Sequence, residues 1–311
     1  MSRFLGRLVD RANATLVAGR TRSSSARTSA STAGALAPMS TDLFGRRAAA
    51  DALTPELDSR GRAYEIWADR KGSWEALRNP AGDRGAPALI VLHGWLAVGL
   101  QRLALQSFMR PLRRSGMDVW YPWLPAHGSR TRAGYVSGAE CLSSDLPGTA
   151  KAIAQGVVET VELAEWLRAR GQSVSIVGFS LGGWIAGLAA TEWSHFHRVA
   201  LFTPVSDPAR SFAESPLVAH IRADLAAAQI TSDQASELLA SVSLCGRDLA
   251  TPRERVLLIG ATEDNVIAED SLELLARRWN CRLEWVGAGH ITSQWTPSAR
   301  RLARDWLRSV V

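Results

Sequence analysis

The chain has 311 residues, 46% of them hydrophobic, which is long and apolar enough for one large domain with a full core. Its formal net charge of +6 equals that of residues 1–50 alone, where eight arginines outnumber Asp10 and Asp42. The excess of basic residues therefore belongs to a leader and does not indicate a nucleic-acid partner. Three scattered cysteines argue against a disulfide framework or a metal site, and no apolar run approaches the roughly 20 residues that cross a bilayer.

Residues 1–50 are predicted to form a basic leader with two parts. Apolar residues from Phe4 to Leu16 recur along one side of a helix, whereas residues 21–41 are rich in Ser, Thr, Ala and Arg. Three interpretations stay open: a disordered bacterial leader (or an extension before a true start at Met39), an organellar transit peptide, and a helix on an anionic membrane surface. We expect a cytoplasmic protein, with any peripheral membrane contact made through residues 1–20.

Residues 51–311 are predicted to form one domain in which strands alternate with helices. Most of the predicted strands are continuous apolar runs, which is typical of parallel strands buried on both faces. This pattern predicts the α/β class, with a mostly parallel central sheet flanked by helices. The predicted strands are 64–67, 74–77, 88–92, 117–121, 174–177, 199–202, 255–260 and 282–286, and the predicted helices are 103–114, 150–170, 181–191, 216–228, 231–242 and 298–310.

The most informative motif is Gly178-Phe179-Ser180-Leu181-Gly182, between an apolar strand and an apolar helix. A serine on a sharp strand-to-helix turn has a strained backbone, and side chains two positions away on either side would collide with the strand and the helix. The bare pattern G-x-S-x-G arises by chance in about one chain in ten of this length. The flanking strand and helix raise its specificity, and they point to an activated serine nucleophile.

Candidate partners for this serine follow two later strands. The strand at 255–260 runs into Glu263 and Asp264, and the strand at 282–286 runs into Gly289 and His290. A histidine can take the proton of a serine, and a carboxylate can hold the imidazole in the required tautomer. Both carboxylates could not reach one histidine at once, so the residues leave Glu263 and Asp264 as alternatives.

The order serine, acid, histidine around such a turn resembles that of the α/β-hydrolases, from about residue 60 to the C-terminus. The resemblance implies that Ser180 is the nucleophile and His290 the base. It also implies an oxyanion hole made by the backbone N–H groups of Trp95 and Leu181, whereas the side chain of His93 in the same His-Gly-Trp turn is structural.

The same resemblance favours Asp264 as the acid. In the family the acid is commonly followed by one residue and then two of Val or Ile, and Asp264-Asn265-Val266-Ile267 fits this frame apart from a missing proline. Glu263 fits the other family pattern, Gly-x-x-Asp, only by position. We expect Glu263 to be a solvated surface charge.

The resemblance also places a helical cap insert at residues 203–252, over the site. Among 12 tryptophans, Trp120, Trp123 and Trp184 fall near strand ends or near Ser180, at the edge where ligands bind in open α/β sheets. We expect these three to line an apolar acyl pocket. The segment Thr203-Pro204-Val205-Ser206-Asp207-Pro208 further resembles a sparsely characterised bacterial branch, related to the eukaryotic α/β-hydrolase-domain-containing group numbered eighteen.

These resemblances imply a serine hydrolase that cleaves a small-molecule ester or thioester of an apolar acyl group, without a metal or organic cofactor. Two alternatives stay open. The same groups would serve an acyltransferase or perhydrolase with a different acceptor. A catalytically silent hydrolase fold that binds a ligand or a protein is the other.

Overall fold

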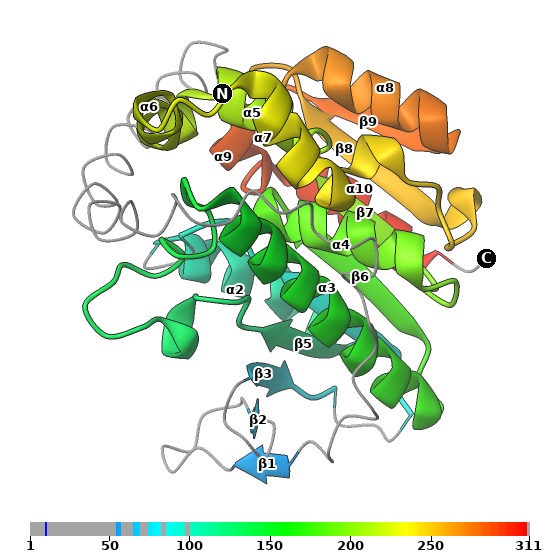
Figure 1. The fold of residues 1–311 in the computed structure, drawn as a ribbon. Helices are drawn as coiled ribbons and strands as arrows, with labels where there is room; N and C mark the ends of the chain where they lie inside the picture. The colour runs from blue at the N-terminus through cyan, green and yellow to red at the C-terminus, as the bar shows by residue number, and fades with distance from the viewer. Residues whose placement is uncertain are drawn as a thin grey trace.

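The computed structural model describes Asp10 and residues 54–56, 65–68, 74–81, 85–96 and 100–309, without the side chains of residues 54–56, 65–68 and 100–104. Within these residues, one 9-stranded sheet has the strand order β1-β2-β3-β5-β4-β6-β7-β8-β9 (Figure 1). Pairing is antiparallel from β1 through β3 to β5, and parallel from β5 through β4 to β9. The sheet is therefore mostly parallel, as the sequence predicts.

From β4 onward, strands alternate with helices, because parallel strands need long crossover connections. Strands β4, β7 and β9 have the predicted bounds, whereas β1, α5, α8 and α9 were not predicted. The strands are β1 Thr54–Glu56, β2 Glu65–Ala68, β3 Glu75–Asn79, β4 Ala88–Leu92, β5 Asp118–Pro122, β6 Val174–Phe179, β7 Val199–Phe202, β8 Val256–Ala261 and β9 Arg282–Val286. The helices are α2 Leu100–Arg114, α3 Leu146–Ala169, α4 Leu181–Glu192, α5 Pro208–Glu214, α6 Ala219–Ala227, α7 Ser232–Leu239, α8 Glu269–Trp279, α9 His290–Ser293 and α10 Pro297–Arg308.

Helices cover both faces of the sheet, α3, α4 and α8 on one face and α2 and α10 on the other. In β4, Ile90 and Leu92 belong to the core on the α3 and α4 side, whereas Leu89 and Val91 belong to the core on the α2 and α10 side. This alternation follows from the two-residue period of a strand. In Figure 1, α3 and α4 lie in front of the sheet. Burial on both faces explains why the central strands are continuous apolar runs.

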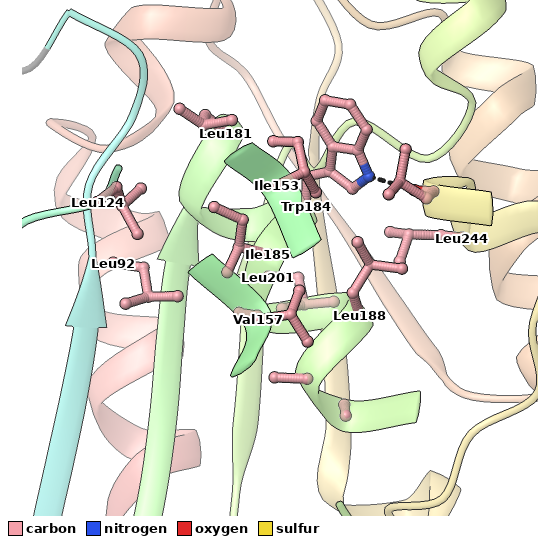
Figure 2. Close-up of a cluster of buried hydrophobic side chains, with 14 of the residues drawn as sticks. Leu92, Leu124, Ile153, Val157, Leu181, Trp184, Ile185, Leu188, Leu201 and Leu244 are labelled. Atoms are coloured by element: carbon pink, nitrogen blue, oxygen red, sulfur yellow. Dashed lines mark hydrogen bonds between the residues drawn. The ribbon is translucent and has the colours of Figure 1, made fainter. Parts of the chain in front are cut away.

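Helix α4 is buried on nearly all sides. Its side chains contact the sheet, α3 and the segment that precedes β8, and the indole Nε1 of Trp184 donates a hydrogen bond to the carbonyl of Val242 at 2.6 Å (dashed line in Figure 2). The helix is therefore apolar all round, as expected of a helix inside a core. Residues labelled in that figure are Leu92, Leu124, Ile153, Val157, Leu181, Trp184, Ile185, Leu188, Leu201 and Leu244.

Residues 203–252 contain α5, α6 and α7, with short 3-10 turns between α5 and α6 and after α7. The predicted helices at 216–228 and 231–242 correspond to α6 and α7 with their adjoining 3-10 turns. Helix α5 has only seven residues, too few for a clear periodic pattern. Its start has a recognisable signal, because Asp207 caps the backbone N–H of Arg210 and Pro208 occupies the first turn.

The predicted leader, residues 1–50, lies outside the described residues except for Asp10. The expected membrane contact through residues 1–20 and the transit-peptide interpretation therefore concern a part of the chain that is not described. Asp10 itself is helical and buried. Among the helices described, none is long and apolar enough to cross a bilayer.

Candidate active site

Ser180 lies at the turn between β6 and α4. Its φ of 54° and ψ of −111° fall outside the regions that residues with a side chain usually adopt. The surrounding contacts are too tight for side chains at the two flanking glycines. A Cβ at Gly178 would overlap the backbone of Gly182, and a Cβ at Gly182 would overlap the carbonyl of Leu92. The turn thus has the strained geometry that the motif predicts.

Ser180, His290 and Asp264 come from three separate segments and form a hydrogen-bonded chain of side chains. Nε2 of His290 lies 2.7 Å from Oγ of Ser180, and Nδ1 of His290 lies 2.7 Å from Oδ2 of Asp264. Oδ1 of Asp264 accepts hydrogen bonds from the backbone N–H groups of Val266 at 2.7 Å and Ile267 at 2.9 Å, which fixes the carboxylate. With its Nδ1 proton donated to Asp264, His290 can accept a proton from Ser180 at Nε2.

The electrostatic setting of His290 favours the imidazolium form. Burial by itself lowers the pKa of His290, but the charge and hydrogen bond of Asp264, and then the charge of Asp10, raise it above its ordinary value of 6.5. An imidazolium forms on this ring whenever it takes a proton from a serine. The two carboxylates therefore stabilise the charged state that such a proton transfer would create.

Glu263, the other carboxylate considered for the acid, is buried rather than solvated. Its backbone N–H donates to the carbonyl of Ala288 at 3.0 Å, and only 3% of the residue is exposed. The expectation of a surface charge is wrong, because the pairing with the β9 side continues past the end of β8 through Thr262 and Glu263, and Glu263 does not enter an exposed loop there. Among the described residues, the carboxylate bonded to His290 Nδ1 is that of Asp264.

Leu181 and Trp95, the predicted oxyanion-hole residues, line the same cavity as Ser180. Leu181 is the first residue of α4, and the N–H groups of a first turn have no partner within their helix. The positive end of the helix dipole also favours a negative oxygen there. Trp95 belongs to the turn after β4, and a Cβ on its neighbour Gly94 would lie 3.7 Å from Cβ of Ser180, so this turn lies against the serine.

His93, in the same turn, is held by backbone groups. Its Nδ1 lies 2.8 Å from the carbonyl oxygen of Gly94, and its Nε2 accepts the backbone N–H of Leu124 at 3.2 Å. Burial, followed by the neighbouring His127, holds the pKa of His93 well below its usual range. A neutral ring with its proton on Nδ1 satisfies both contacts, which is a structural arrangement.

A small cavity of about 40 Å³ lies beside Ser180. Its walls are mainly apolar and come from the turn after β4, from α4, from the loop after Asp264 and from α5 with the residues that follow it. Five apolar members of the lining are Trp95, Trp184, Phe212, Val218 and Ile267. Within residues 203–252, the part that lines this cavity lies between Val205 and Val218.

Of the three tryptophans predicted for the pocket, Trp184 lines the cavity, but Trp120 and Trp123 are not among the described residues that do. The ring of Trp120 packs against Trp166 of α3 at 5.6 Å, and that of Trp123 packs against Tyr121 at 5.4 Å. The prediction was wrong for these two because β4 separates β5 from β6, the strand that leads to Ser180.

Asp10 is a residue of this site that the sequence did not indicate. Its Oδ2 accepts the backbone N–H of His290 at 2.8 Å, and its Oδ1 accepts that of Ile291 at 3.1 Å. A single aspartate in a basic leader, 280 positions from the histidine, carries no pattern that could have revealed this contact. As for metals, the described residues contain no group of three or more His, Cys, Asp or Glu that could hold an ion.

The fold is that of the α/β-hydrolases, and the similar solved structures include esterases. Acetyl xylan esterase 1 from Thermoanaerobacterium sp. JW/SL YS485 has a TM-score of 0.65 and 16% identity, over 90% of this chain and 97% of that one. The acetyl xylan esterase from Paenibacillus sp. R4 has a TM-score of 0.63 and 14% identity, over 87% of this chain and 92% of that one. An esterase from Pyrococcus furiosus has a TM-score of 0.52 and 14% identity, over 88% of this chain and 97% of that one. No family model and no curated protein sequence matches this chain.

Proposed function

We propose that this chain is a serine hydrolase that cleaves esters or thioesters of short acyl groups. The observation that carries the proposal is the hydrogen-bonded chain from Asp264 through His290 to Ser180, with both contacts at 2.7 Å. A serine hydroxyl is a weak nucleophile by itself, and a histidine oriented by a carboxylate activates it. A protein that only binds a ligand has no need of a strained serine within reach of such a pair.

In the proposed reaction, Oγ of Ser180 attacks the acyl carbonyl carbon while Nε2 of His290 takes the hydroxyl proton. The backbone N–H groups of Leu181 and Trp95 stabilise the negative oxygen, and removing one such donor costs about 3–4 kcal/mol in a comparable hydrolase. His290 then returns the proton to the leaving group as its bond to the acyl carbon breaks. Water attacks the resulting acyl-enzyme in the same manner, and the carboxylic acid and Ser180 are released.

The cavity beside Ser180 supports a short acyl group. A single water molecule needs about 10–15 Å³ of such space, so about 40 Å³ accepts only a few non-hydrogen atoms. Because Trp184, Phe212 and Ile267 make its walls apolar, an acetyl or propionyl group fits better than a charged one. The sequence led us to expect an apolar acyl group of any length, and this proposal restricts it to a short one. The names of two similar structures, both acetyl xylan esterases, agree with the acyl size, and the alcohol part of the substrate is outside the proposal.

The test is hydrolysis of p-nitrophenyl esters from acetate to palmitate by the full chain, with Ser180→Ala as the control. We expect the highest kcat/KM with acetate or propionate and a loss of roughly 10⁴- to 10⁶-fold in kcat for the variant. Equal activity of the variant would refute the proposal, and an optimum at long chains would refute the acyl size. Failure to turn over any ester, with Ser180 labelled by a fluorophosphonate, would favour a transferase. If the chain neither turns over an ester nor takes up the fluorophosphonate label, a binding protein is favoured.

Two finer expectations from the sequence stay predictions. One is the resemblance to the branch related to the α/β-hydrolase-domain-containing group numbered eighteen, which depends on the segment at residues 203–208 and on the His-Gly-Trp turn. The other is peripheral contact between residues 1–20 and an anionic membrane, which a vesicle-sedimentation assay with and without anionic lipid would test.

A further inference from the structure

We propose that Asp10 is a positioning residue for His290. The proposal deepens the function proposed above and rests on it for the catalytic role of His290. The contact itself can be tested without any catalysis.

The first argument is the hydrogen bonding at the start of α9. This helix begins at His290, and the N–H groups of its first turn have no partner within the helix. A side-chain oxygen of the preceding residue usually accepts one of them, but the preceding residue is Gly289, which has no side chain. Asp10 supplies the missing acceptor, with one carboxylate oxygen on His290 N–H at 2.8 Å and the other on Ile291 N–H at 3.1 Å.

The second argument is where this contact lies relative to the reacting atoms. The N–H held by Asp10 belongs to the same residue whose ring joins Ser180 and Asp264 at 2.7 Å on each side. Two carboxylates thus hold His290. That of Asp264 is bonded to the imidazole ring of His290, and that of Asp10 is bonded to the backbone N–H of His290. A displacement of about 1 Å in such a group can cost about 100-fold in rate. Fixing the backbone of His290 therefore fixes the distance over which the proton moves.

The third argument is the burial and charge of Asp10. Only 1% of this residue is exposed, and a carboxylate that is buried without hydrogen bonds would be strongly destabilising. The two backbone N–H groups meet this need. The titratable groups that act on one another here are His290, Asp264 and Asp10. Burial raises the pKa of Asp10, and the Asp10 charge in turn helps to raise the pKa of His290.

A merely structural anchor and a positioning residue lead to different results. If Asp10 were only a structural anchor, its replacement would lower the stability but leave the turnover of the remaining folded molecules unchanged, whereas a positioning residue also lowers that turnover. In both cases Asp10→Asn lowers the pKa of the imidazole, because a negative charge is removed beside the cation, so the pKa of His290 tests whether the contact exists. Activity needs a neutral His290, so the acidic limb of the pH profile then moves to lower pH.

The experiment compares Asp10→Asn, Asp10→Ala and Asp248→Asn in the full chain, using p-nitrophenyl acetate from pH 5 to 9. Asp248 is the matched control, because its side chain is 89% exposed and its ion pair with Arg278 lies on the surface. We expect Asp10→Ala to lower kcat between about 10- and 100-fold with a smaller change in KM. Asp10→Asn should move the acidic limb of the pH profile to lower pH. Asp248→Asn should change neither kcat nor the position of that limb. The proposal would be overturned if both Asp10 variants had the kcat of the wild type and the same acidic limb in the pH profile.

The second measurement needs no substrate. An NMR titration follows the imidazole signal of His290, assigned by its loss in His290→Gln, in the wild-type chain and in Asp10→Asn. A lower midpoint in Asp10→Asn supports the contact even if the wild type hydrolyses no ester, in which case the proposed function alone has failed. An unchanged midpoint refutes the positioning role even if the enzyme is active. Should Asp10→Ala not fold, Asp10→Asn carries the test alone, because it keeps the size and one acceptor oxygen of the side chain.

Discussion

Gly182 and Leu92 are in direct backbone contact, since a Cβ on the glycine would overlap the carbonyl of the leucine. The contact joins the first turn of α4 to the end of β4. The proposed donors to the oxyanion are Leu181, the first residue of α4, and Trp95, in the turn that follows β4. The absence of a single side chain at Gly182 therefore sets how closely the two halves of the proposed oxyanion hole approach each other.

We expect Gly182→Ala to lower the free energy of unfolding by about 1–3 kcal/mol, the usual cost of overpacking, or more. The obstacles are backbone atoms of Leu92 and His93, which cannot rotate away as a side chain could. Gly246→Ala is the matched control, because a Cβ there meets nothing within 4 Å. Urea denaturation of both variants measures the difference. Equal midpoints for Gly182→Ala and the wild type would mean that α4 and β4 are farther apart than described.

The second prediction concerns the choice of acid. Asp264→Asn should lower kcat by about 10⁴-fold, because an amide at this place favours the wrong imidazole tautomer. Glu263→Gln, a change of the same kind in the neighbouring buried residue, should cost far less, since Asp264 rather than Glu263 is bonded to Nδ1 of His290. Steady-state kinetics of the two variants with p-nitrophenyl acetate decide the point. The opposite ranking would assign the acid to Glu263.

The parts of the fold that the sequence predicts depend on neighbours along the chain. β4, β7 and β9 have the predicted bounds, and β4 and β7 are continuous apolar runs with burial on both faces. The turn at Ser180 is recognisable because its tight contacts require glycine at fixed offsets on both sides. Such features leave a local pattern, so a single chain is enough to identify them.

The parts that the sequence misses depend on the order of strands and on distant contacts. Nothing in the residues around Trp120 and Trp123 states that β4 lies between β5 and β6, and so both were assigned to the pocket. The backbone pairing of Glu263 with Ala288, at a buried position beyond the end of β8, is likewise a contact between distant parts of the chain. The contact between Asp10 and His290 is the extreme case, because each residue is ordinary in its own segment.

The third prediction concerns the acyl size. Phe212 lies on α5 and lines the cavity, so Phe212→Ala should enlarge it and move the optimum among p-nitrophenyl esters from acetate to longer chains. Truncation of a buried phenylalanine also costs about 3–5 kcal/mol of stability, and a control must separate the two effects. Phe196→Ala is that control, because Phe196 packs on Trp193 at 4.5 Å and is not among the described residues that line the cavity. An unchanged chain-length profile for Phe212→Ala would remove α5 from the acyl site.

The last prediction is a loss of stability in mild acid that arises at His127. This ring is fully buried, and its Nδ1 lies 2.8 Å from the carbonyl oxygen of Pro125. Burial, with a smaller contribution from Arg130, lowers the pKa of His127 to about 4, although the hydrogen bond to Pro125 opposes the shift. Between the ordinary pKa of about 6.5 and about 4, the unfolded chain binds a proton here that the folded chain does not.

The contribution of His127 is therefore complete above pH 6.5 and is lost as the pH falls towards about 4, by up to about 3 kcal/mol. Urea denaturation at intervals from pH 7 to pH 4 measures this slope in the wild-type chain and in His127→Gln, whose amide can still donate to Pro125. The variant should lose less stability over this range, and the buried His93 should account for part of what remains, because its pKa is lowered too. His195→Gln, at an exposed histidine, should keep the wild-type slope. Identical slopes for all three proteins would show that His127 takes up its proton without unfolding, which requires a path for water to the ring.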